Sequence, residues 1–237
     1  MSVKLTGSGA AKFLSARIPR GFPNLILSAV IALAVAGTAI SPVRAEPAQL
    51  AKLTTEDRGD IKRIENYLNA LRTVEARFLQ VSSNGGYAEG RLYISRPGKM
   101  RIDYAPPAKL EIVADGKSLI YHDKELEQIS HIALEDTPAN ILLQKNVRLL
   151  SGPVRVRSVS RGPGIVQIDM VKVDDPQEGS VALVFGDRPL ALKKWTITDA
   201  QGVITTVSLL RSRFDAPIDP KIFTFDDPDY ELFRNDS

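Results

Sequence analysis

The hydrophobic positions of this chain follow two periods, first that of a helix and then that of a β-strand. Between Thr54 and Leu71 the apolar residues recur at intervals of three and four, which predicts one face of an amphipathic helix. Thr54 or Thr55 can cap this helix, and two acidic residues follow at the positive end of its dipole. The apolar face consists of Ile61, Ile64, Leu68 and Leu71.

After about Thr73 apolar and polar residues alternate, which is the period of half-buried β-strands. Turn residues separate many of these runs, and Asp115-Gly116 is a typical hairpin signal. Short alternating strands at near-regular spacing predict an antiparallel, strongly curved sheet or barrel. Strands are predicted at residues 87–95, 99–104, 110–112, 117–122, 154–160, 165–173, 180–185, 191–198 and 203–211.

One apolar segment interrupts the strands. Residues 136–143 begin with Thr137 and Pro138, which suit the start of a helix, and continue with Ile141, Leu142 and Leu143. This pattern predicts a helix of about two turns. Because the segment is too apolar for an outer surface, we expect it to pack over the sheet. The predicted fold class is therefore mostly β with helices (α+β).

The first 45 residues have the pattern of an export signal. A basic stretch ends at Arg20, an apolar run extends from Leu25 to Ile40, and Val43-Arg44-Ala45 resembles a cleavage site. The apolar run is shorter than the ~18 residues of a membrane span. An uncleaved N-terminal anchor is the alternative interpretation. We expect a signal peptide at 1–45 and one soluble domain at 46–237, periplasmic in a Gram-negative bacterium.

Composition and charge exclude several classes of function. The chain has no cysteine and only two histidines, so thiol catalysis, cysteine-ligated metals and disulfide scaffolds are excluded. Lys and Arg number 31 and Asp and Glu 28, but the first 45 residues hold five of the basic residues and no acidic one. The rest of the chain is thus slightly acidic, and we expect no binding to nucleic acid.

No catalytic motif accompanies the strands. The sequence has neither an HExxH nor a GxSxG motif, and Gly116-Lys117-Ser118 lacks the earlier glycine of a phosphate-binding loop. His122 and His131 are more typical of surface positions on a hairpin than of a metal site. We therefore expect no enzyme activity, no catalytic residue, no cofactor and no metal.

An ordered set of short motifs resembles the family of periplasmic outer-membrane lipoprotein carriers, the LolA family. The resemblance runs from about Ile61 to Phe225, behind a signal peptide and without a lipidation cysteine. Each motif alone is common, and the order of the set carries the resemblance. The motifs are Phe78-x-Gln80, Gly90-x-Leu92-x-Ile94-x-Arg96-Pro97, Tyr104-x-x-Pro107, Asp115-Gly116-x-x-Leu119, Gln128, Thr137-Pro138 and Phe223-Thr224-Phe225.

The resemblance implies an incomplete β-barrel with helices that form a lid over an apolar cavity. It also implies a carrier that takes acylated lipoproteins from an inner-membrane ABC transporter and passes them to an outer-membrane receptor. In the family an arginine at the position of Arg96 hydrogen-bonds the lid helices in the empty protein, so Arg96 is the candidate lid latch. From the residues alone, the alternative interpretation is that Arg96 merely leaves a strand before a proline turn and is solvated. We also expect this carrier to be a monomer.

Alternation along the strands selects the residues expected to face the cavity, and Met100 stands where well-studied relatives have an aromatic residue. The same pattern fits a filled core, because both arrangements need inward-facing apolar side chains. A lipoprotein- or lipid-sensing regulatory module on a related half-barrel is the alternative function. The candidate cavity residues from alternation are Leu92, Ile94, Met100, Ile102, Tyr104, Leu110 and Ile112, and Leu119, Ile141 and Leu142 are added to them.

Overall fold

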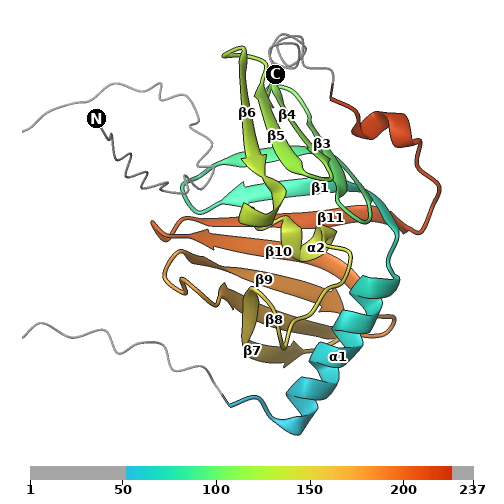
Figure 1. Ribbon diagram of the computed structural model, residues 1–237, viewed down its shortest axis with the longest axis vertical. Helices are drawn as coiled ribbons and strands as arrows, with labels where there is room; N and C mark the ends of the chain where they lie inside the picture. Colours follow the sequence, from blue (N-terminus) through green and yellow to red (C-terminus); the bar gives the residue numbers. More distant parts are fainter. Residues whose placement is uncertain (1–51, 226–237) are drawn as a thin grey trace, which may run out of the picture.

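The computed structural model describes residues 52–225, so the predicted signal peptide at 1–45 lies outside the described residues. A helix, α1 (Thr55–Ala70), precedes eleven strands of one sheet (Figure 1). The strands are β1 (Thr73–Ser82), β2 (Tyr87–Ser95), β3 (Lys99–Tyr104), β4 (Leu110–Asp115), β5 (Ser118–Asp123), β6 (Gln128–Ala133), β7 (Val154–Gly162), β8 (Ile165–Lys172), β9 (Gly179–Gly186), β10 (Ala191–Asp199) and β11 (Ile204–Phe214).

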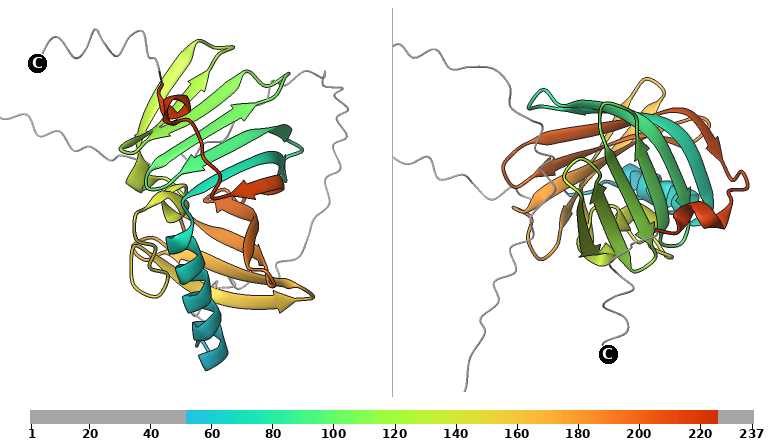
Figure 2. Two further views of the ribbon diagram at one scale, coloured as in Figure 1. Left: turned by 90° about the vertical axis from the view of Figure 1, so that its right-hand side faces the viewer. Right: turned by 90° about the horizontal axis from the view of Figure 1, so that it is seen from above.

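The sheet is antiparallel and open. Its strand order is β6-β5-β4-β3-β2-β1-β11-β10-β9-β8-β7, and every pair is antiparallel. Strands β6 and β7 are the two edges, so the sheet does not close into a barrel. It twists and curves around the side that carries α1 and a short helix, α2 (Asn140–Leu143) (Figures 1 and 2). The prediction of a mostly β, curved antiparallel fold is confirmed.

Helix α1 forms where the helical period predicts it. Thr54 is the N-cap, and its hydroxyl accepts a hydrogen bond from the backbone N–H of Asp57. The Asp57 carboxylate in turn accepts from the backbone N–H of Thr54 at 2.9 Å, which completes a capping box. The side chains of Ile61, Ile64 and Leu68 are buried, so the apolar face packs inward.

The main core lies between the concave face of the sheet and its helical cover. Side chains that alternate along β1 and β2, such as Phe78 and Leu92, point into one hydrophobic cluster with the apolar face of α1. The other face of the sheet carries a second covering segment, the short helix η2 (Pro220–Phe223), which contacts β3 and β4 (Figure 2). Phe223 is buried there, although no periodicity predicts this segment.

The segment at 136–143 is helical for a shorter distance than predicted. A 3-10 turn, η1 (Leu134–Asp136), comes first, and the α-helical part is the single turn α2. The Thr137 hydroxyl donates to the carbonyl of Leu134 at 2.8 Å, so it closes the preceding turn and does not cap α2. The expectation of about two turns is therefore wrong, but the segment does cover the sheet, because Ile141 and Leu143 are buried in the core cluster.

Candidate functional site

The ten residues expected to face a cavity all belong to the core cluster or pack against it. Alternation therefore identified the side chains of the concave face. They contact one another and the helices, so the space between sheet and helices is largely filled in this structure. Leu92, Ile94, Met100, Ile112, Leu119 and Ile141 are buried members of the cluster, and Ile102, Tyr104, Leu110 and Leu142 are partly buried against it.

Among the ten candidate residues, Tyr104 has a polar side-chain group, a hydroxyl, that lies against the core. Its hydroxyl donates to the side-chain carbonyl of Gln80 at 2.9 Å, and its ring packs edge-on against Phe78 with 5.2 Å between ring centroids. Burial raises the pKa of Tyr104, so the phenol is neutral at physiological pH. A satisfied neutral hydroxyl is compatible with an apolar surface.

A pocket of about 220 Å³ opens beside the short helix. Pro138 and Ile141 form one wall, and Met170, Val181 and Ile197 from β8, β9 and β10 form the other. Small-molecule sites usually enclose about 300–1,000 Å³, so the pocket is smaller than a complete ligand site. Of the ten candidate residues, Ile141 alone is among the residues that line it.

Arg96 lies between the ends of the two helices. Its guanidinium donates to the carbonyl of Leu71 at 3.2 Å and to the carbonyl of Gln144 at 2.6 Å. Leu71 is the C-cap of α1 and Gln144 is the C-cap of α2, and helix ends leave such carbonyls without helical partners. The last turn of α1 has no basic residue, so Arg96 supplies the cation that this negative helix end favours.

The guanidinium of Arg96 is only partly satisfied. Its Nε is buried and has no hydrogen-bond partner among the described residues. Burial lowers the pKa of Arg96, because a low-dielectric environment disfavours the charged form. A half-buried cation with an unsatisfied donor is held less tightly than one with a full set of partners.

Two polar side chains of α1, which belong to none of the sequence motifs, hold the segment that follows α2. Asn69 donates to the carbonyl of Val147 at 3.1 Å and accepts from its N–H at 2.8 Å. The buried Glu65 carboxylate accepts from the N–H of Leu149 at 2.6 Å. The available signal was their position, because Glu65 follows Ile61 by four residues and thus lies within the apolar face.

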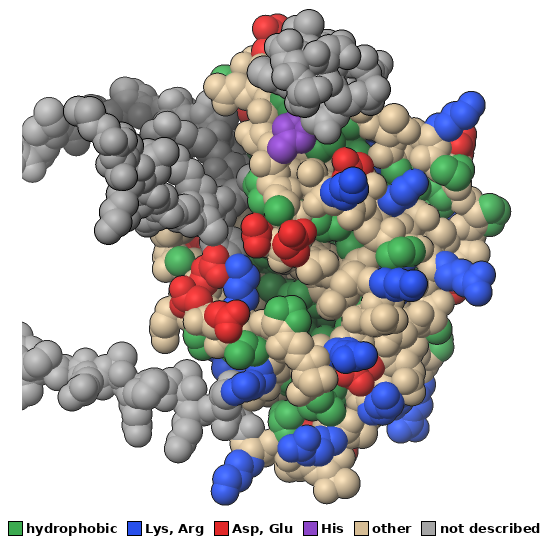
Figure 3. All heavy atoms as spheres, in the orientation of Figure 1, with side chains coloured by type: hydrophobic (Ala, Val, Ile, Leu, Met, Phe, Trp, Pro, Cys, Tyr) green, Lys and Arg blue, Asp and Glu red, His purple; other side chains and the backbone are tan. Residues whose placement is uncertain are grey.

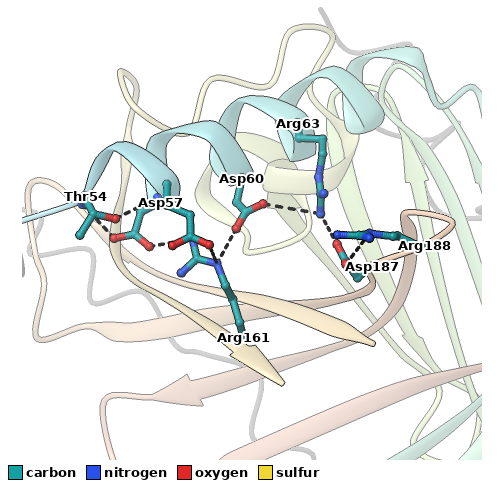
Figure 4. Close-up of polar contacts among 8 residues, drawn as sticks. Thr54, Asp57, Asp60, Arg63, Arg161, Asp187 and Arg188 are labelled. Carbon is teal, nitrogen blue, oxygen red and sulfur yellow. Dashed lines mark hydrogen bonds and ion pairs between the residues drawn. The ribbon is translucent and has the colours of Figure 1, made fainter. Parts of the chain in front are cut away.

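The first half of α1 is attached to the sheet by exposed ion pairs (Figure 4). Arg161 on β7 contacts Asp57 at 2.9 Å and Asp60 at 2.8 Å, and Arg63 contacts Asp187 after β9. Hydrogen bonds from Thr54 lower the pKa of Asp57, and the hydrogen bond from Arg63 lowers the pKa of Asp187. These pairs are solvent-screened and contribute less than the buried contacts.

A larger pocket of about 400 Å³ lies on the opposite face, between β1–β3 and the segment around η2. Its charged groups already pair with one another or with neighbours. Arg101 contacts Asp103 at 2.8 Å, and Glu75 contacts Arg213 at 3.2 Å. Size alone therefore does not make this pocket the functional site. Within residues 52–225 no three His, Asp or Glu side chains gather as metal ligands do.

Fold and site define a class of protein in which a curved, open antiparallel sheet carries an apolar concave face under a hydrogen-bonded helical cover. Among the described residues, no helix has the length and apolar character needed to cross a membrane.

Comparison with known proteins gives the family. The family model described as "Outer membrane lipoprotein carrier protein LolA" matches residues 69–226. An outer-membrane lipoprotein carrier protein of Methylococcus capsulatus is 28% identical over 179 residues, which cover 70% of this chain and 83% of that protein. One from Chromobacterium violaceum is 28% identical over 175 residues, covering 71% and 84%. The crystal structure of a LolA superfamily protein from Nitrosomonas europaea aligns with a TM-score of 0.39 at 12% identity, over 70% of this chain and 97% of that one.

The chain belongs to the LolA family of outer membrane lipoprotein carrier proteins. The resemblance inferred from the ordered motifs is thereby confirmed. The family is one of carriers, in agreement with the expectation of a binding protein.

Proposed function

We propose that this protein is a periplasmic carrier that binds the acyl chains of lipoproteins released from the inner membrane and delivers them to the outer membrane. It takes its cargo from a lipoprotein-releasing ABC transporter and gives it to an outer-membrane receptor. It acts by binding alone, as a monomer, after removal of the signal peptide at 1–45. Family membership and relatives named lipoprotein carriers support this proposal.

The observation that carries the proposal is an apolar concave surface under a helical cover, with hydrogen bonds from Arg96 at the helix ends. Each buried methylene of an acyl chain is worth about 0.8 kcal/mol, so one long chain represents ~10 kcal/mol or more. Water between two membranes therefore blocks free transfer, and a carrier must offer a water-shielded apolar surface. The core side chains of β2 and β3, such as Leu92 and Met100, supply that surface once the helices move away.

In this proposal Arg96 is the latch that holds the cover in the empty protein. It joins the carbonyls of Leu71 and Gln144, and so fixes the C-terminal ends of α1 and α2 to the β2–β3 hairpin. Loading breaks these two hydrogen bonds, and the burial of acyl methylenes offsets their loss. The pocket beside Ile141 is where we expect acyl chains to enter first, because space is already present there.

The decisive experiment mixes the purified protein with spheroplasts and asks whether newly made lipoproteins appear in the soluble fraction. A one-to-one complex with soluble lipoprotein is the result expected of a carrier. If lipoproteins stay on the spheroplasts, the carrier proposal is wrong and a sensing role is favoured.

A second measurement tests the latch with a matched pair of arginines on the same hairpin. We expect Arg96→Leu to change the transfer of cargo to the receptor several-fold while the protein stays folded. Arg91→Leu, at an exposed position of β2, should leave transfer unchanged. Normal transfer by folded Arg96→Leu protein would overturn the latch and leave the carrier proposal intact.

A further inference from the structure

One long stretch of the chain carries cations and no acids. From Thr137 to Ile168 the sequence has five basic residues and no Asp or Glu. The stretch contains α2, the segment that leads away from it, and the edge strand β7. It is the longest acid-free run among the described residues, although residues 90–102 also hold four basic residues and no acid.

Four of the five cations have no carboxylate partner among residues 52–225. Arg161 is the exception, because it pairs with Asp57 and Asp60. The other four form what we call the basic band: Lys145, Arg148, Arg155 and Arg157.

The basic band has a fixed position beside α1. Its loop residues flank Val147 and Leu149, which α1 holds through Asn69 and Glu65. Lys145, Arg148 and Arg155 are exposed, and Arg157 is partly buried. Figure 3 shows basic side chains over the lower part of the face, where Figure 1 draws β7 and α1, and others over its upper right part. An exposed apolar side chain, Leu150 at 43% exposure, follows Arg148 in the same loop.

Protection of the sheet edge explains part of this pattern. Charged residues and bulges on edge strands prevent pairing with other chains, and β7 has both a bulge after Val156 and the cations Arg155 and Arg157. Protection of the edge strand does not account for Lys145 and Arg148, because both lie in the loop before β7. Cations on the edge strand and on the loop that leads into it lie around one edge of the sheet, and an anionic partner could bind there.

We propose that the basic band docks the protein on the anionic headgroups of a phospholipid bilayer. Each Lys or Arg near an anionic membrane raises partitioning about fivefold, and an exposed leucine adds a shallow apolar contact. The band adjoins the pocket, because Gln144 and Val154 line it, and the pocket border also includes the acidic residues Glu135, Asp136 and Glu178. The inference does not rest on the carrier function, because the empty protein displays the band.

The test is sedimentation of the empty, soluble protein with phospholipid vesicles. We expect binding to vesicles that contain phosphatidylglycerol, weak binding to vesicles of phosphatidylcholine alone, and loss of binding as salt screens the charges. Glutamine substitution of all four band residues should lower binding to the anionic vesicles by about tenfold or more. Leu150→Asp should weaken binding as well, without removing any cation.

The control removes the same charge from another surface. Arg77, Arg91, Lys193 and Lys194 are exposed on β1, β2 and β10, and their replacement by glutamine should leave vesicle binding nearly unchanged. Circular dichroism confirms that each variant is folded. A smaller loss in the band variant, or an equal loss in the control, overturns the proposal. Binding of a soluble oligoglutamate peptide to the band, without vesicle binding, would assign the surface to an acidic protein partner and would also overturn it.

Discussion

The two ends of the helical cover are held in different ways. At one end, which we call the pinned end (residues 143–149), backbone groups are bonded to other elements through Arg96, Asn69 and Glu65. At the other, the pocket end (residues 137–142), the hydrogen bonds given by the described part of the chain stay between residues 134 and 144. The pocket end also borders an empty volume of about 220 Å³. A cover fixed at one end and weakly packed at the other can open as a hinge.

The difference also indicates which bonds resist opening. Removing the partner of a buried polar group costs about 1–3 kcal/mol, whereas apolar packing beside a pocket is already incomplete. The pinned end therefore resists separation, and the pocket end is expected to separate from the sheet first. Variants at three places in the cover test this difference, and they are ordered by the loss of stability expected of each.

The largest expected effect is a difference in the loss of stability between alanine variants of two residues of α2. Leu143 is fully buried at the pinned end, and Ile141 is buried but borders the pocket. Truncation to alanine costs about 2–5 kcal/mol, and most where the site cannot relax. We expect Leu143→Ala to cost about 4 kcal/mol and Ile141→Ala about 2 kcal/mol in urea unfolding. Equal losses for the two variants would contradict the distinction between the ends.

The second prediction concerns the carboxylate that binds the backbone of the pinned end. Glu65→Ala leaves the N–H of Leu149 without its partner, and a hydrogen bond to a charged group contributes about 1.5–3 kcal/mol. We expect unfolding to become easier by about 2 kcal/mol, and the Leu149 amide to exchange its hydrogen faster than before.

A conservative variant separates the hydrogen bond from the packing of the side chain. Glu65→Gln keeps an acceptor oxygen in place and should retain about half of the stability that Glu65→Ala loses. Asn69→Asp keeps the acceptor for the N–H of Val147 but loses the donor to its carbonyl, and it should accelerate exchange less than Asn69→Ala. If exchange at Val147 and Leu149 is unaffected by any of these variants, the pinned end is held by packing alone.

Local periodicity predicted most of the fold, because burial on one side of an element leaves a clear pattern. The face of α1 and the strands from β2 to β5 follow it closely. Strand β6 was not predicted, since it is an edge strand with exposed residues on both faces, such as Gln128 and His131. The short helix η2 was missed because its burial depends on contact with β3 and β4, which are distant in sequence.

The site was predictable only in part. Alternation selected side chains of the concave face, but it does not distinguish a cavity from a core, and here they pack into a core. Arg96 entered through the family resemblance, because a proline turn gives no indication of what a preceding arginine contacts. The contacts of Asn69 and Glu65 with residues 147 and 149 join segments about 80 residues apart, and such pairings are not encoded in local pattern.

The smallest expected effect lies at the exposed ion pairs of the first half of α1. The pKa of Asp57 and that of Asp187 are lowered from 3.8, so the folded protein favours their ionised forms. Their contribution to stability is complete above the unfolded pKa and is lost as the pH falls through the lowered native pKa. The double variant Asp57→Asn and Asp187→Asn should therefore lose less stability than the parent between about pH 5 and pH 2.

Salt distinguishes the two carboxylates, because the causes of their pKa shifts differ. Hydrogen bonds from Thr54 dominate at Asp57, and they are short and local. Arg63 dominates at Asp187, and an exposed ion pair is screened by added salt. We therefore expect high salt to reduce the acid-range difference from the parent more for Asp187→Asn than for Asp57→Asn. An equal loss of the difference at both variants would contradict this distinction between the two carboxylates.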